Sequence, residues 1–290
     1  MTSELSFIAA LRTLPLHPAA RNLDDDCAVL EVGSETLVLT HDMMLAGTHF
    51  LSEQDPADVA WKLVATNISD LAAKGAEPVG VLLGYQLGDG DARFVEGLRE
   101  ALTHYGAALL GGDTVGGSGP QASGLTAIGR ATHRPVPSRG GARAGDRVWL
   151  TGAVGAAMVA LEALRAGAGD SSAYRRPQAK LAEGLALAPH VTAMMDVSDG
   201  LLLDAWRMAR ASGACLSLDS TAVPLACPEP RREEALRWGD DYELLFTLPA
   251  GTAPPVAATC IGEVLEGPSG TLQLDGKHVE AGDNLGFEHH

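Results

Sequence analysis

Aspartates stand at the ends of apolar runs along this chain, and they are the residues whose type and placement could do chemistry. Six occupy such junctions: Asp26, Asp42, Asp70, Asp113, Asp196 and Asp199. A single carboxylate at such a point is usually a cap or a turn former. Carboxylates gathered in one cleft would repel and raise one another's pKa unless a cation lay between them. Oxygen ligands without nearby Cys or His partners favour magnesium over zinc.

The stretch "AMMDVSDGLLLDAW" (193–206) carries three carboxylates beside Met, Val, Leu and Trp. We expect Ser198 and Asp199 to stand at the start of a helix whose leucines face the core. A helix start is also a natural anion site, because its first backbone N–H groups are unpaired. We therefore place Asp196 and Asp199 on the cleft side as magnesium ligands. Asp204, inside the helix, is predicted to be an ordinary residue of its polar face.

Glycines surround Asp113 in "LLGGDTVGGSG" (109–119). Glycine lets backbone N–H groups approach a phosphate, on which Asp113 could hold a metal, although a plain turn explains these glycines equally well. The P-loop and Rossmann glycine patterns are both missing, which argues against those nucleotide sites. His49 beside a phenylalanine in "AGTHF" is more often a packing residue. The acids of "GDDYELLF" (239–246) form either a charged turn or a ligand contact.

The composition excludes several classes of function. The formal charge is −16, from 21 basic and 37 acidic residues, so nucleic acid is a poor partner. Divalent cations could still bridge such a surface to phosphates. The four cysteines form no C-x-x-C pair, and no uncharged apolar run reaches membrane-spanning length. The N-terminus has no basic signal-peptide region. We expect a soluble, cytoplasmic protein that binds neither nucleic acid nor membrane.

Helical and strand patterns alternate along the chain, which predicts an α/β protein with two domains. The expected helices cover residues 6–14, 55–75, 91–106, 156–167, 179–188 and 201–213. The expected strands cover 36–44, 79–87, 107–114, 124–132, 147–155, 214–219 and 242–248, and the run 107–114 is predicted to be buried. "HRPVPSRGGARAGD" (133–146) is rich in Pro, Gly and Arg and breaks the pattern. We divide the chain there into domains 1–134 and 135–290.

Six motifs in one order resemble a known family. They are "DDDCAVL", "HDMMLAGTHF", "NISDLAAKGAEP", "LLGGDT", "DVSDGLLLD" and "GDDYELLF". Together they closely resemble the thiamine-monophosphate kinases, over nearly the whole chain from about Phe7 to Phe287. That family belongs to the superfamily of aminoimidazole ribonucleotide synthetase and selenophosphate synthetase. "NISDLAAKGAEP" and "DVSDGL" indicate the superfamily, whereas "AGTHF" and "GDDYELLF" point to the kinase.

The resemblance implies a fold, a reaction and a site. The fold would be two α/β domains with mixed sheets, of which the N-terminal sheet pairs with its twin in a homodimer. The reaction would convert ATP and thiamine monophosphate to ADP and thiamine diphosphate with magnesium. The six aspartates would be the metal ligands. The implied ATP contacts are Gly112, Asp113, Arg139 and Ser198. The implied substrate contacts are His49, Asp240 and Phe287.

Several positions depart from the family pattern. Asp24 replaces a glycine in the first motif, and His41 stands where Thr or Ser commonly precedes Asp42. The acid of "GDDYEL" that is usually glutamate is Asp240, one methylene shorter, which could loosen a substrate contact. An arginine often found after "GGDT" is missing. The end, "GFEHH", resembles an aromatic C-terminal segment, with two histidines that are either native or the start of a tag.

The implied mechanism needs no covalent intermediate and no general base, because the acceptor is already a phosphate oxyanion. We therefore expect no catalytic side chain in the strict sense, with Arg139 adding positive charge near the phosphates and His49 orienting the acceptor.

Three rival functions stay open at this stage. One is another ATP-using member of the superfamily, although Cys27 does not lie in the glycine-rich segment that selenophosphate synthetase would need. A second is a non-catalytic binder of nucleotide or thiamine phosphate, suggested by His41 and Asp240. A third is a purely structural acidic protein, which predicts no magnesium-dependent ATP binding.

Overall fold

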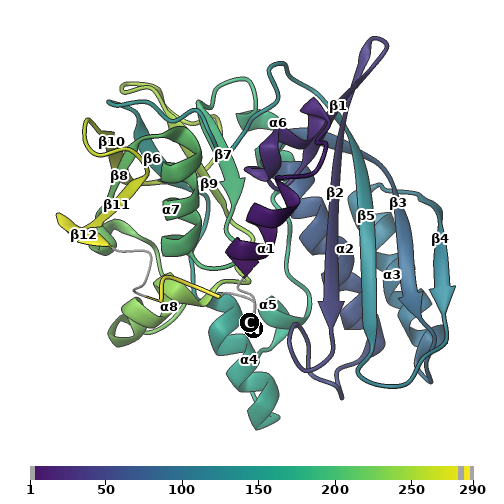
Figure 1. Cartoon of the computed structure of the whole chain (residues 1–290). Helices are drawn as coiled ribbons and strands as arrows, with labels where there is room; N and C mark the ends of the chain where they lie inside the picture. Colours follow the sequence, from purple (N-terminus) through teal and green to yellow (C-terminus); the bar gives the residue numbers. More distant parts are fainter. Residues whose placement is uncertain (1–3, 280–283, 288–290) are drawn as a thin grey trace.

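The computed structural model describes residues 4–279 and 284–287, so the terminal histidine pair lies outside the described part of the chain. Its first sheet has five strands in the order β1-β2-β5-β3-β4 (Figure 1). These strands are β1 (Ala28–Val32), β2 (Glu35–Leu45), β3 (Ala76–Gln86), β4 (Leu109–Val115) and β5 (Ala122–Ala131). β3 and β4 run parallel and the other neighbours antiparallel, so the sheet is mixed, as predicted.

Helices α2 (Pro56–Ala73) and α3 (Asp91–Tyr105) form a layer on one face of this sheet (Figure 1). Asp55 caps α2, because its carboxylate accepts the N–H of Ala57 at 3.0 Å. Every residue of α2 after Pro56 is buried, because the helix lies between the first sheet and the C-terminal half. Gly184 on α6 (Leu181–Leu187) allows this contact, since a Cβ there would stand 2.0 Å from the carbonyl oxygen of Ala72.

None of the described segments covers the other face of the first sheet (Figure 1). The strand register and the neighbours of Gly80 place exposed, large apolar side chains on it: Met43, Leu45, Leu82, Leu110 and Val115. The prediction of a buried strand over 107–114 is right about the strand and wrong about its burial, since every residue of β4 is exposed. β4 is an edge strand, and an apolar run cannot show whether the chain itself or a partner covers it.

The second sheet has seven strands in the order β12-β11-β8-β10-β6-β9-β7, and it is also mixed. Its strands are β6 (Arg147–Leu150), β7 (Ala193–Asp196), β8 (Cys215–Leu218), β9 (Leu244–Leu248), β10 (Thr259–Leu265), β11 (Thr271–Leu274) and β12 (Lys277–Val279). The other helices are α1 (Glu4–Leu11), α4 (Ala156–Ala166), α5 (Ser172–Arg175), α6 (Leu181–Leu187), α7 (Leu201–Ser212) and α8 (Arg232–Trp238). The sequence patterns did not predict β1, β7, β10, β11, β12, α5 or α8.

Helix α7 packs on the second sheet through the three leucines of its first turn, all of which are buried. Trp206 packs partly buried against the same core, as expected from the sequence. The four cysteines are free thiols. Among the described residues, no helix combines the length and the apolar character that a membrane span requires.

Candidate active site

A cavity of about 1070 Å³ lies between the two halves of the chain. Its lining comes from both sheets and from helices α1, α2, α4, α5, α7 and α8. At one end, Arg139 and Arg207 pair with carboxylates and Arg210 lies over Trp206. At the other end, Lys62 contacts the His49 carbonyl, Asp240 and the Tyr174 ring, and Arg165 and Arg237 line the cavity there with Trp238. The sequence is thereby folded so that residues far apart in the chain share one concave site.

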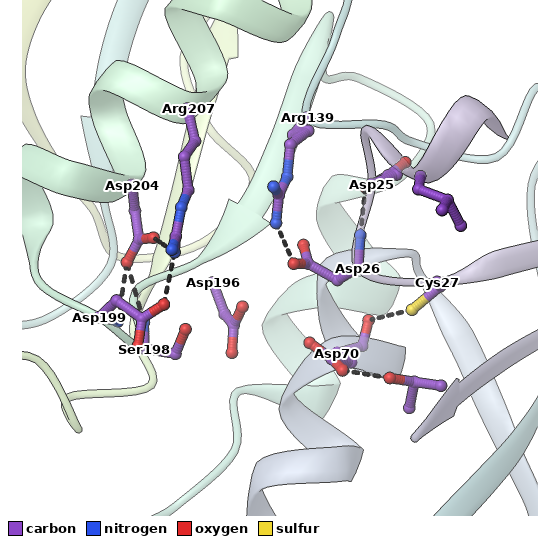
Figure 2. Close-up of polar contacts among 12 residues, drawn as sticks. Asp25, Asp26, Cys27, Asp70, Arg139, Asp196, Ser198, Asp199, Asp204 and Arg207 are labelled. Atoms are coloured by element: carbon purple, nitrogen blue, oxygen red, sulfur yellow. Dashed lines mark hydrogen bonds and ion pairs between the residues drawn. The ribbon is translucent and has the colours of Figure 1, made fainter. Parts of the chain in front are cut away.

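Three of the predicted metal ligands meet at the centre of this cavity. Asp26 precedes β1, Asp70 lies on α2, and Asp196 ends β7 (Figure 2). One carboxylate oxygen from each lies within 4.8 Å of the other two. Asp26 Oδ2 is buried and has no hydrogen-bond partner in the described structure. Such an orphaned oxygen in a cluster of hard donors fits a divalent cation such as magnesium.

Asp42 and Asp199 adjoin this cluster and line the same cavity. Burial, with the charges of Asp196, Asp26 and Asp199, raises the pKa of Asp42 to about 7. Burial and the charge of Asp26 likewise raise the pKa of Asp196 to about 6. The buried carboxylates of Asp42, Asp70 and Asp196 therefore repel one another and Asp26, as expected for ligands of a divalent cation.

Polar neighbours hold these carboxylates in place. Thr40 donates to Asp70, and Ser69 donates to Asp196 Oδ2 at 2.6 Å. Asn67 accepts the backbone N–H of Asp42 at 3.2 Å. Asn67 and Ser69 were not predicted, although polar residues inside a helix with no exposed face are a usable signal of a buried site.

The loop that carries Asp26 is fixed by buried cations. Lys74, fully buried, contacts Asp25 Oδ1 at 2.5 Å, and Arg21 contacts the other oxygen of Asp25 at 2.6 Å. Burial alone would raise the pKa of Asp25, but Lys74 holds it well below its usual value. Arg139 pairs with Asp26, as Figure 2 shows, and lines the cavity. The predicted nucleotide contact Arg139 thus also neutralises a predicted metal ligand.

The predicted substrate contacts gather at the opposite end of the cavity. The rings of His49 and Phe287 lie 6.5 Å apart, and Asp240 lines the same region. Both carboxylate oxygens of Asp240 are engaged, one by Lys62 at 2.6 Å and the other by the Tyr242 hydroxyl at 2.8 Å. Lys62 was not predicted, although a lysine within the otherwise buried α2 marks the position.

Gly112 and Asp113 do not reach this cavity in the single chain. Both lie on β4, the edge strand of the first sheet. In the sheet, β5 and β3 separate β4 from the strand that carries Asp42. Asp113 pairs in register with Gly84 and, across β5, shares the open face of the sheet with His41. His41 hydrogen-bonds Thr126 there at 2.8 Å and is exposed.

Asp204 corrects one sequence prediction, because it is not a polar-face residue. Its side chain is fully buried and accepts the backbone N–H groups of Ser198 and Asp199, both at 3.1 Å (Figure 2). Helical periodicity predicts which face of a helix a residue occupies. It does not predict that the side chain bends back to accept hydrogen bonds from the preceding loop. Ser198 and Asp199 precede α7, as predicted, although the helix itself begins at Leu201.

Two mixed sheets with a carboxylate-lined cavity between them define a class of protein. Residues 24–131 match the N-terminal domain of AIR synthase related proteins, and residues 143–275 match their C-terminal domain. The chain therefore has the two-domain architecture of that superfamily. Solved structures of thiamine monophosphate kinases share it.

The structure described as "AaThiL complexed with AMPPCP and TMP" superposes with a TM-score of 0.88 at 29% identity, covering 99% of this chain and 97% of that one. The thiamine-monophosphate kinase of Escherichia coli strain K12 is 33% identical over 92% of this chain and 91% of its own length. That of Caulobacter vibrioides is 36% identical over 94% and 86%. The chain belongs to the thiamine-monophosphate kinase family, which confirms the resemblance of its motifs.

Proposed function

We propose that this protein transfers the terminal phosphoryl group of ATP to thiamine monophosphate, giving thiamine diphosphate and ADP. The observation that carries the proposal is the cavity itself. Its carboxylate centre lies between an arginine-lined end and an end lined by aromatic side chains, in a chain of this family. This arrangement suits two phosphorylated substrates, one at each end of the cavity, whose phosphate groups meet at a cation held by the central carboxylates.

The residues at the arginine-lined end suit the nucleotide. Four arginines line it: Arg12, Arg139, Arg207 and Arg210. The Trp206 ring also lines it, and Arg210 Cζ lies 4.6 Å from the centre of that ring. We propose that Arg139 contacts the phosphates as a fixed positive charge, which stabilises charge that develops on the leaving group. Ser198, on the loop before α7, lines the same cavity, and we propose that it contacts ATP as well.

The opposite end suits thiamine monophosphate. Tyr174, Trp238 and Phe287 line it with apolar surface for the two rings. We propose that Asp240 faces the cationic thiazolium and that His49 orients the acceptor phosphate toward the centre. His49 Nδ1 accepts the backbone N–H of Leu45 at 3.0 Å, which fixes the ring's orientation.

We propose that Asp26, Asp42, Asp70, Asp196 and Asp199 hold magnesium, which would neutralise the facing phosphates of the two substrates. The acceptor is already an oxyanion, so the chain needs to supply no general base. Its own contribution is to hold two polyanions in line at short separation and to exclude water from the transfer. ATP as a substrate agrees with the expected cytoplasmic location, which cell fractionation would test.

We further propose that the protein works as a homodimer formed through the open face of the first sheet. The exposed apolar side chains on that face support this, because monomers rarely leave such a patch uncovered. Gly112 and Asp113 lie on β4 beside that face, so their predicted contacts with ATP and magnesium would require a second copy. Light scattering of the purified chain measures its mass directly.

One assay tests the reaction. The purified protein is incubated with ATP, magnesium and thiamine monophosphate, with thiamine as the control acceptor. We expect thiamine diphosphate from the monophosphate and no product from thiamine. Product from thiamine alone would overturn the acceptor, and tight binding of both substrates without any product would favour a non-catalytic binder.

A further inference from the structure

The loop that precedes α7 is held by a buried pair, Asp204 and Arg207, one helical turn apart. Asp204 Oδ2 accepts the N–H groups of Ser198 and Asp199, each at 3.1 Å, and its Oδ1 lies 3.0 Å from Arg207 Nη1. The same Arg207 nitrogen lies 2.5 Å from Asp199 Oδ2. Figure 2 shows that the pair thereby contacts both the backbone and the side chain of this loop.

The arrangement differs from an ordinary helix cap. An ordinary cap residue precedes its helix and accepts an N–H group of the first turn. At α7 the residue in that position is Gly200, which has no side chain, and Asp204 reaches backward from inside the helix instead. Gly200 has φ +116, and a Cβ there would stand 2.7 Å from the carbonyl oxygen of Arg237, so the loop turns where only glycine fits.

The pair acts on residues that face the cavity. Ser198 and Asp199 line it, as does Arg207, whereas Asp204 has no exposed surface and does not. A fully buried carboxylate is expensive unless every oxygen is satisfied, and here both are. The hydrogen bonds that offset the burial of Asp204 therefore hold Ser198, Asp199 and the Arg207 guanidinium in a single arrangement.

We propose that Asp204 and Arg207 are positioning residues that set Asp199 and Ser198 for the cation and the nucleotide. The inference rests on the proposed function, because it takes magnesium and ATP as the ligands of that loop. Asp204 acts through the backbone, and Arg207 acts through the Asp199 carboxylate. Neither needs to touch the acceptor. The backbone of the loop does contact the acceptor end, because Ser198 O accepts the N–H of Asp240 at 2.7 Å and Asp199 O accepts the N–H of Phe287 at 2.8 Å. The acceptor end should therefore respond to loss of Asp204, which holds this backbone, and not to loss of Arg207, which holds the Asp199 side chain.

Asp204→Asn and Arg207→Met test the proposal separately. The amide keeps one acceptor oxygen but turns its other group, a donor, toward Arg207. Methionine leaves the backbone contacts of Asp204 intact and releases the Asp199 side chain. Asp146→Asn is the matched control, because Asp146 is also a buried carboxylate of the C-terminal half that accepts a backbone N–H, from Arg143 at 2.9 Å, and it lies outside the cavity.

Magnesium binding is measured by calorimetry in the presence of a non-hydrolysable ATP analogue, and steady-state kinetics are measured beside it. We expect both test variants to bind magnesium about tenfold more weakly and to lose about 10- to 100-fold in kcat/KM for ATP. The KM for thiamine monophosphate should change by less than about twofold in Arg207→Met and should rise in Asp204→Asn, whose loop backbone also carries Asp240 and Phe287. Asp146→Asn should lower the melting temperature without changing these constants.

The proposal fails if both variants keep wild-type magnesium affinity and wild-type KM for ATP, even with a lower melting temperature, because a helix-stabilising role alone would give that result. If Asp204→Asn does not fold, the magnesium affinity of Arg207→Met without nucleotide decides, because Arg207 also lines the nucleotide end and its loss would weaken ATP binding directly. An inactive wild-type protein would overturn the proposed reaction instead, and the calorimetric comparison would still decide the role of the pair.

Discussion

At the scale of single residues, the central carboxylates repel one another unless they bind a cation or a proton. Asp42 is the clearest case, because burial and three neighbouring aspartates raise its pKa to about 7. The ionised form that would bind a metal is therefore the form that the protein alone disfavours. Function and stability make opposite demands on this side chain.

Asp42→Asn should separate the two demands. We expect turnover at saturating magnesium to fall by about 100-fold or more, since the amide is a weaker ligand without charge. Without magnesium at about pH 8, the free energy of unfolding should rise by about 1 kcal/mol, because one repelling charge is gone. Steady-state assays and urea unfolding measure the two effects.

Asp89→Asn is the control, because Asp89 carries the same charge but is exposed and lies outside the cavity. It should leave turnover within about twofold of wild type and not raise stability. Near-normal turnover of Asp42→Asn at saturating magnesium would contradict its assignment as a ligand.

At the scale of elements, α2 connects the two ends of the cavity. Asp70, near its C-terminus, reaches the carboxylate centre, and Lys62, in its middle, reaches the acceptor end. Lys62 has 2% of its side chain exposed and bonds Asp240 at 2.6 Å and the carbonyl oxygen of His49 at 3.2 Å. It also lies 4.0 Å from the centre of the Tyr174 ring, so three segments of the acceptor end meet on one ammonium group.

Lys62→Met should therefore loosen the acceptor end selectively. We expect the KM for thiamine monophosphate to rise by about tenfold with little change in the KM for ATP, because Asp240 and the His49 loop lose their shared partner. Stability should fall by about 2 kcal/mol, since the partly buried Asp240 carboxylate is left without its cation. Substrate-dependence curves and urea unfolding check the two effects.

Lys180→Met is the matched control, because Lys180 pairs with Glu243 at 3.1 Å and does not line the cavity. It should change neither KM. An equal rise in both KM values for Lys62→Met would show a general loss of structure, and would contradict a role specific to the acceptor end.

Some elements could be predicted from the sequence alone and others could not. The period of "DPADVAWKLVATNISDLAAKG" and its cap predicted α2 to within two residues, because local pattern determines a helix. β7 was missed, since four buried residues ending in Asp196 form too short a run to show any period. The Asp24–Asp26 motif was noticed, but its dependence on Lys74 was not, because that contact joins residues 49 apart.

The same reasoning explains the limits of the predicted site. Five of the predicted aspartates line one cavity, although their places in the elements differ: Asp26 precedes β1, Asp42 lies within β2, Asp70 lies within α2, Asp196 ends β7 and Asp199 precedes α7. It was the resemblance of the motifs, and no shared position in the elements, that grouped them. Asp113 was grouped with them although it lies on an exposed edge strand outside the cavity of the single chain. Asp204 was predicted to be a polar-face residue because helical periodicity gives the position of its Cα only. It does not show that the carboxylate accepts the N–H of Ser198 in the preceding loop.

At the scale of the whole molecule, the open face of the first sheet should control assembly. Leu82→Asp places a charge on that face, where Leu82 is 40% exposed. We expect the variant to be monomeric at concentrations where the wild type is dimeric, and to bind ATP more weakly because β4 no longer meets a second copy. Light scattering and calorimetry measure the two properties.

Val95→Asp is the control, because Val95 is equally apolar and 48% exposed but lies on α3, on the other side of the sheet. It should remain dimeric. A wild-type chain that is monomeric at micromolar concentration would contradict dimerisation through the open face. A monomeric Leu82→Asp variant with unchanged ATP affinity would show that ATP binding does not depend on the second copy.

The charge balance of the whole cavity predicts how stability changes with pH. Asp42, Asp196 and Asp204 have pKa values raised from 3.8 to about 7, 6 and 7 in the folded protein. The folded state therefore holds more protons than the unfolded state between these values. The stability they contribute is fully present below about pH 4 and is lost as the pH rises through about 7.

Asp25 acts in the opposite direction. Lys74 lowers its pKa, so its contribution is present above about pH 4 and is lost as the pH falls below that value. Without magnesium, the free energy of unfolding should therefore be greatest at about pH 4 and should decline as the pH rises from there to about 7, with little further change toward about pH 8.

Magnesium should remove the decline, because the cation takes the place of the protons that the carboxylates release. We expect magnesium at about 100 times its dissociation constant to add about 2.7 kcal/mol at about pH 8 and much less at about pH 5.5. Urea unfolding with magnesium or with a chelator, at both pH values, measures the difference. Asp42→Asn should reduce the magnesium-dependent gain at the higher pH. A gain of equal size at both pH values would mean that the ion binds elsewhere, since only ligands that titrate in this interval can link the two effects.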